Sequence, residues 1–219
     1  MQRPVGSFRL PLALCASLVL GWGSPARAQG VPSPANSTVP AMIALVGTTN
    51  GVPADAKGAF EVTIRDLANN PVAGAPVIVD LSNLPELHLC ADPLDPDAIV
   101  DCAMKRVTKH TDALGRVRFT LLGGSVSDPP VRSPHGSGRI HWGGVMLIGA
   151  PTVAAYDLDG ANGVGVNDLS LWLEDFGTGL DIGRGDYDGS GHLGVNDLSL
   201  WLGVFGSNAC LESCATACP

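Results

Sequence analysis

Residues 165–173 read Gly-Val-Asn-Asp-Leu-Ser-Leu-Trp-Leu, and residues 194–202 repeat them without a change. An acidic segment precedes each copy: Asp-Leu-Asp-Gly at 157–160 and Asp-Tyr-Asp-Gly at 186–189. The two copies are 29 residues apart, a period long enough for one acidic loop and one helix per unit. The sequence therefore predicts that residues 155–207 form two such units.

The predicted helices span residues 168–176 and 197–205, with Gly177 and Gly206 as their C-terminal caps. Apolar residues recur at helical spacing in both copies. They are Leu169, Trp172, Leu173 and Phe176 in the first, and Leu198, Trp201, Leu202 and Phe205 in the second. We expect these stripes to form a core shared by the two units.

The second loop has the pattern of a calcium site. Calcium takes six to eight oxygen ligands, and an EF-hand-type loop supplies them from alternate positions around a glycine at the sixth. The expected ligands are Asp186, Asp188 and Ser190 at positions one, three and five, the His192 carbonyl at seven and Asp197 at twelve.

The first loop has a poorer ligand set. Asp157, Asp159 and Asp168 hold positions one, three and twelve, and the Gly163 carbonyl holds the seventh. Ala161 offers no oxygen at the fifth position, and Asn162 replaces the turn glycine, a change that Asn tolerates because it adopts positive φ readily. We predict two calcium sites, of which the first is the weaker.

The duplicated Asp-x-Asp-Gly segments and the Asn-Asp-Leu at 167–169 and 196–198 resemble the dockerin module of cellulosome-type assemblies. An Asp at the twelfth position, where ordinary EF-hands carry Glu, agrees with this resemblance. The resemblance implies a small all-α module that docks onto a cohesin-like or cell-surface partner through the loop exits and one helix face. The implied contact residues are Val166, Asn167, Ser170, Leu171, Val195, Asn196, Ser199 and Leu200.

Residues 41–154 predict a β-sandwich. Phe60, Val62 and Ile64 alternate with polar residues, as expected of a strand with one apolar face, and similar sets cover 77–81 and 117–121. Further strands are expected at 42–46, 139–142 and 145–148, and a hairpin at 107–121 turning at Gly115. About seven short strands indicate an immunoglobulin-like sandwich, and the segments 66–74 and 111–119 resemble bacterial immunoglobulin-like repeats.

The ends of the chain predict export. Residues 1–28 read as a signal peptide, 29–40 as a linker and 208–219 as a cysteine-containing tail, which favours a secreted or cell-surface location. No stretch of the mature chain predicts a membrane span. The net charge of −8 argues against a nucleic-acid partner, and nothing in the sequence indicates an oligomeric state.

Five cysteines follow the signal peptide. We expect Cys90 and Cys102 to form a disulfide; the alternative is a metal site that they share with His88 and His110. The pairing of Cys210, Cys214 and Cys218 stays open, because five thiols leave at least one unpaired.

The sequence predicts a non-enzymatic protein that uses its dockerin-like part to dock an immunoglobulin-like domain. One alternative is an accessory protein of extracellular polysaccharide degradation, either a carbohydrate-binding module or a small glycoside hydrolase. Residues 41–154 show no pair of acids on separate strands and no series of aromatic residues to support it. The other alternative is a structural subunit of a surface array, cross-linked through unpaired cysteines.

Overall fold

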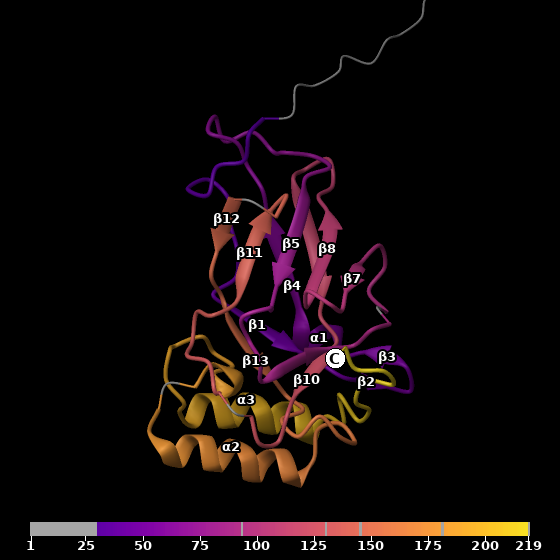
Figure 1. Ribbon diagram of the computed structural model, residues 1–219, viewed down its shortest axis with the longest axis vertical. Coiled ribbons are helices and arrows are strands. Elements are labelled where there is room, and N and C mark those ends of the chain that lie inside the picture. Colours follow the sequence, from indigo (N-terminus) through magenta and orange to yellow (C-terminus); the bar gives the residue numbers. More distant parts are fainter. Residues whose placement is uncertain (1–29, 93, 130, 145, 181, 219) are drawn as a thin grey trace, which may run out of the picture.

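The computed structural model describes residues 30–92, 94–129, 131–144, 146–180 and 182–218. The predicted signal peptide at 1–28 lies outside the described residues. In these residues the chain is mostly β-structure with three short α-helices (Figure 1). Residues 30–40, expected to be a linker, run beside the strand that ends at Thr63, where Thr38 and Thr63 exchange two backbone hydrogen bonds of 2.8 and 2.9 Å.

The largest sheet has five antiparallel strands in the order β12–β11–β5–β8–β7. Its strands are β5 (Pro76–Asp80), β7 (Ile99–Asp101), β8 (Arg106–His110), β11 (Arg139–Trp142) and β12 (Met146–Gly149). Val77 and Val79 of the central β5 are buried, as expected of alternate residues that share one face of a strand. This sheet fills the upper part of Figure 1.

The remaining strands pair two by two. β4 (Ala59–Thr63) lies antiparallel to β9 (Arg116–Thr120), and β1 (Met42–Leu45) lies parallel to β13 (Thr152–Ala155). β6 (Leu87–Leu89) pairs with β10 (Gly123–Ser125), and β2 (Thr48–Thr49) with β3 (Val52–Pro53), just before the one-turn helix α1 (Asp55–Gly58).

One apolar core joins these strands into a sandwich-like arrangement. It takes inward residues from the five-stranded sheet, such as Val79 and Ile140, and from the pairs β4–β9 and β1–β13, such as Phe119 and Ile43. Trp142 is half-buried and packs against this core, which agrees with a structural role for its ring.

The expected hairpin at 107–121 is wrong. β8 pairs with β5 and β7, whereas β9 pairs with β4, so the turn that contains Gly115 carries the chain from one layer to the other. Gly115 has φ of +73°, and a Cβ there would approach the Ile64 carbonyl oxygen to 2.5 Å. A glycine is thus required here because the turn between β8 and β9 passes close to Ile64, and not because the two strands form a hairpin.

The expected fold class is wrong for the end of the chain, because no separate all-α module follows the sandwich. The segment contains α2 (Val166–Thr178), a 3₁₀ turn η1 (Gly183–Gly185) and α3 (Val195–Gly206). Both α-helices lie at the lower end of Figure 1. Both helices begin two residues earlier than predicted, and α2 continues through Gly177 to a left-handed cap at Gly179.

A second core explains why this segment is not independent. Trp172 and Trp201 are buried in one cluster with Ala44 and Val46 from the start of the β region and with Ala154 of β13. The helices therefore use the end of the β structure as part of their own core. Two helices of 13 and 12 residues have little apolar surface to bury without it.

The tail returns to the β region through two disulfides. Cys90 bonds to Cys214 and Cys102 bonds to Cys218, across 124 and 116 residues of sequence. The predicted Cys90–Cys102 bond is therefore wrong, and neither thiol is free to bind a metal. Cys210 is free and buried.

The disulfides are compatible with an extracellular location, because such bonds persist in oxidising compartments. None of the described helices has both the length and the apolar content needed to cross a membrane.

Candidate functional site

Each acidic loop gathers three carboxylates. Asp157, Asp159 and Asp168 each place an oxygen within 4.8 Å of the others, and Asp186, Asp188 and Asp197 do the same in the second loop. These are the six side chains that the sequence predicted as carboxylate ligands. The first loop also borders a surface hollow of about 170 Å³ that Asp159 and Asp168 help to line.

The twelfth residue of each loop holds the loop closed. Oδ1 of Asp168 accepts hydrogen bonds from the backbone N–H groups of Leu158 (2.6 Å) and Asp159 (3.0 Å), and its Oδ2 accepts one from Gly165 N–H (2.7 Å). Asp197 repeats these three bonds at 2.7, 3.0 and 2.8 Å. Each Asp therefore links the loop entrance to the first turn of the following helix.

The two units bind each other reciprocally. The indole N–H of Trp172 donates to the Gly185 carbonyl, one residue before the second loop, and that of Trp201 donates to the Tyr156 carbonyl, one residue before the first; both distances are 3.1 Å. The Tyr156 and Tyr187 rings stack between the units with centroids 4.7 Å apart. The predicted shared core is confirmed for the two Trp residues, which are buried.

The acidic clusters carry negative charge in buried positions. Asp157, Asp168, Asp186 and Asp197 are all buried, and no Lys or Arg of the described residues forms a salt bridge with them. Burial raises the pKa of Asp157 and Asp186 and raises that of Asp168 to about 6. Carboxylates held close together away from water are costly unless a proton or a cation compensates their charge.

The donor set fits calcium better than a transition metal. Every side chain in the two clusters is a carboxylate, which is a hard oxygen ligand, and no His or Cys belongs to either cluster. The loop backbones also have the required turns. Asn162 and Gly191, both at the sixth position, have φ of +63° and +87°, so the turn predicted to survive the Asn substitution is present.

No family model, curated protein or solved structure matches this chain.

The predicted docking residues lie on α2 and α3. Val166, Asn167 and Ser170 are exposed on α2, and Val195, Asn196, Ser199 and Leu200 are exposed on α3. Leu171 differs from its counterpart Leu200, because it is half-buried against the second core. Seven of the eight side chains that the resemblance implies as contact residues are thus accessible.

Other apolar side chains of α2 and α3 are accessible as well. Four of them were expected to lie in the core and do not: Leu173, Phe176, Leu202 and Phe205. Val166 and Val195, which were expected to be contact residues, are exposed beside them. The exposed fractions in the first copy are 68% for Val166, 49% for Leu173 and 47% for Phe176. The corresponding fractions in the second copy are 79% for Val195, 45% for Leu202 and 40% for Phe205. The signal available in the sequence was their equal spacing in both copies. The second core is filled instead by the two Trp residues together with the two Tyr rings and residues of the β region.

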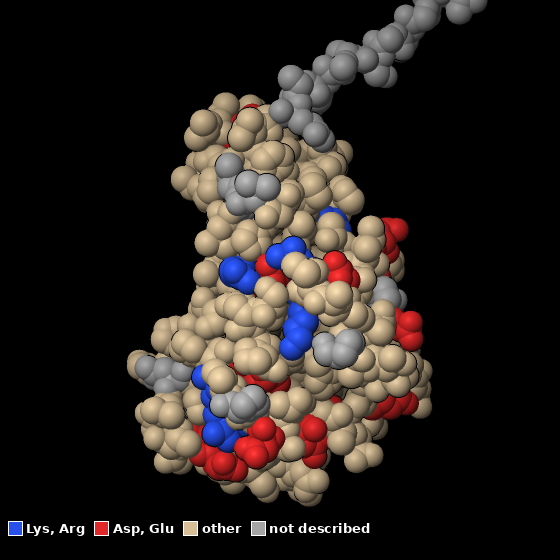
Figure 2. All heavy atoms as spheres, viewed as in Figure 1, with Lys and Arg blue, Asp and Glu red and all other residues tan. Residues whose placement is uncertain are grey.

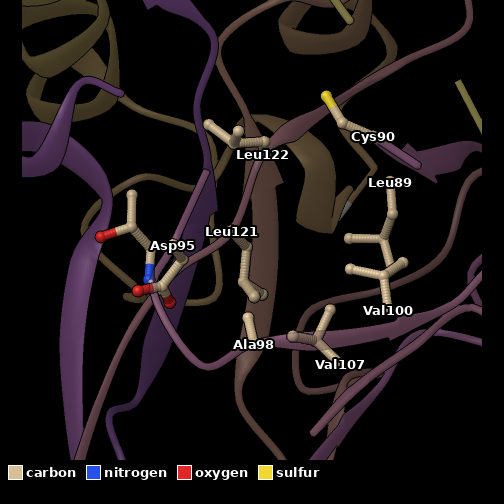
Figure 3. Close-up of a pocket in the computed structure, with 9 residues that line it drawn as sticks. Leu89, Cys90, Asp95, Ala98, Val100, Val107, Leu121 and Leu122 are labelled. Carbon is tan, nitrogen blue, oxygen red and sulfur yellow. Dashed lines mark hydrogen bonds between the residues drawn. The ribbon is translucent and has the colours of Figure 1, made fainter. Parts of the chain in front are cut away.

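Among the described residues, no third cluster of acidic, His or Cys side chains could hold a metal ion. On the face visible in Figure 2, blue Lys and Arg atoms lie beside red Asp and Glu atoms and form no continuous basic patch. A cavity of about 10 Å³ beneath Cys90 is lined mainly by apolar side chains, with Asp95 at one side (Figure 3). Asp95 is already paired with Lys109 at 2.8 Å, and the cavity has room for about one water.

Proposed function

We propose that the protein is an exported, non-catalytic calcium-binding protein. Its two acidic loops bind calcium, the first less tightly than the second. The helices after the loops dock onto a cohesin-like or cell-surface protein. The oxygen-only donor sets support the metal, and the dockerin-like residues of the repeat support the class of partner.

The observation that carries the docking proposal is the paired exposure of the same apolar side chains on both helices. Isolated exposed apolar residues are ordinary on a protein surface, but a repeated Val, Leu and Phe at matching positions is a candidate contact surface. Calcium would act on this surface indirectly. Asp168 and Asp197 connect each loop to the first turn of its helix, so a cation in the loop would fix the helix start.

The test is capture of a partner by the immobilised full chain in calcium, followed by elution with a chelator. The probes are an extracellular and cell-surface fraction and a panel of purified cohesin domains. We expect chelator to release the captured protein, because calcium removal loosens both loops.

The double variant Leu173→Ser and Leu202→Ser tests the docking surface. Capture is expected to fall by at least about tenfold, the effect typical of a central apolar contact, while calcium binding is retained. The matched control is Leu67→Ser, which changes a strongly exposed Leu in the turn at residues 66–70. Undiminished capture by the double variant would refute this surface, and capture that resists chelator would refute the role of calcium.

A further inference from the structure

The tail at residues 208–219 forms hydrogen bonds with the first acidic loop. Val164 N–H donates to the Cys210 carbonyl at 2.8 Å, and Gly163 N–H donates to the Ser213 hydroxyl oxygen at 2.8 Å. The Ser213 hydroxyl in turn donates to Asp157 Oδ2 at 2.6 Å. A residue 56 positions after Asp157 thus contacts the carboxylate at the first position of the loop.

The second loop makes comparable but not identical bonds from within itself, because the Ser190 hydroxyl donates to the His192 carbonyl at 3.1 Å and not to the first-position Asp186. Its fifth-position Ser190 provides a hydroxyl oxygen that accepts from His192 N–H at 3.4 Å, and Gly191 N–H donates to Asp186 Oδ2 at 2.9 Å. His192 is the seventh residue of this loop, as Gly163 is of the first. In both loops, therefore, a serine hydroxyl oxygen accepts the seventh-position N–H, although Ala161 removes that serine from the first loop's own sequence.

Several bonds fix the position of Ser213. Its neighbour Cys214 is bonded to Cys90, and its other neighbour Glu212 exchanges backbone hydrogen bonds with Thr48 at 3.1 and 2.9 Å. The Glu212 carboxylate also accepts the Thr48 hydroxyl at 2.7 Å. The hydroxyl of Ser213 is consequently held at the loop by covalent and backbone bonds on both sides.

We propose that Ser213 is the fifth-position oxygen ligand of the first calcium site, supplied by the tail in place of Ala161. This inference rests on the proposed function, because it requires calcium in the loop. A hydroxyl oxygen has one proton and two lone pairs. The proton binds Asp157 and one lone pair accepts Gly163 N–H, so the second lone pair is available to a cation. The first site is then assembled from two distant parts of the chain.

Calorimetric titration of the full chain with calcium chloride tests the proposal. The Asp186→Ala background removes the second site, so that the remaining binding belongs to the first. In that background Ser213→Ala is expected to weaken calcium binding by about 10- to 100-fold, the range for losing a group that supports a metal site. Adding Ala161→Ser, which returns a hydroxyl to the loop, is expected to restore most of the affinity.

Thr216→Ala is the matched control, because it removes an exposed hydroxyl from the same tail. Unchanged affinity of Ser213→Ala, or a loss that Ala161→Ser fails to restore, would overturn the ligand role of Ser213 and leave the proposed function standing. Absence of calcium binding by the unmodified protein would instead overturn the proposed function itself.

Discussion

The carboxylates at the first position of the two loops are equivalent in placement, and each is expected to affect calcium binding at its own loop. Asp186→Ala should abolish the tighter calcium-binding event and Asp157→Ala the weaker one, each by at least about 100-fold, because each removes a charged ligand. Titration calorimetry separates the two events. Asp128→Ala, an equal change of charge at an exposed residue that belongs to neither loop, should alter neither event. Loss of the tighter event in Asp157→Ala, with the weaker event retained, would reverse the ranking.

Asp168 gives the calcium-free protein a characteristic pH dependence. Its pKa is raised to about 6 by burial, against about 4 in an unfolded chain. Between these values the folded protein retains a proton that the unfolded chain has released, so this residue's contribution to the free energy of unfolding falls as the pH rises. Thermal unfolding of calcium-depleted protein should therefore show the wild type losing stability relative to Asp168→Asn from about pH 4 to about pH 6. A parallel pH profile for the two proteins would contradict this assignment.

At the scale of elements, one buried ion pair attaches α2 to the rest of the molecule. Arg184 of η1 and Asp175 of α2 are both fully buried and form two hydrogen bonds, of 2.6 and 3.1 Å. Arg184 also donates to the Val126 carbonyl at 2.8 Å, next to β10. The pair therefore connects helix, turn and strand.

Arg184→Ala leaves the Asp175 carboxylate buried without its closest partner. We expect the free energy of unfolding to fall by about 3 kcal/mol, since breaking a buried pair from one side is strongly destabilising. The half-buried Arg132 still contacts Asp175 at 2.9 Å, so we expect the loss of stability to lie at the lower end of the usual range. Urea denaturation measures the change, and Arg116→Ala, at an exposed pair, is the control. Equal stabilities of the two variants would show that the buried pair contributes little.

The sequence predicted individual strands and helices better than it predicted which strands pair with each other. Alternation predicted β4, β5 and β9, and the repeat predicted both helices, because these patterns depend only on which side of an element is apolar. Alternation does not specify which strand lies alongside, so the expected hairpin between β8 and β9 was wrong. Likewise, the repeat predicted the six loop carboxylates, whereas Ser213 is an isolated serine with no spacing to relate it to Ala161.

For the whole molecule, the shared second core predicts one cooperative unfolding transition. The β region and the helices bury Trp172 and Trp201 together, so neither part can unfold and leave the other's core intact. Differential scanning calorimetry should show one transition, and depletion of calcium should move it to lower temperature, because binding to the folded state adds to stability. Two separate transitions would contradict the shared core. A transition that is indifferent to calcium would contradict a stabilising metal.

The disulfides show the limit of sequence reasoning at this scale. Cys90 and Cys102 were expected to pair because they are close in the sequence. The fold instead brings the tail back across β6, where Cys218 N–H donates to the Leu89 carbonyl at 2.7 Å, and so places Cys214 and Cys218 beside them. The expectation of cross-links between copies also loses its basis, because Cys210 is buried and both other tail cysteines are paired within the chain.

Because of the two disulfides, a break in the backbone does not separate the molecule into two parts. A protease that cuts anywhere between residues 102 and 214, for example in the exposed segment 126–128, produces two fragments joined by both disulfides. Such a nicked protein keeps its mass on a non-reducing gel and divides only when a reductant is added. Damage of this kind would therefore leave the acidic loops attached to the β region.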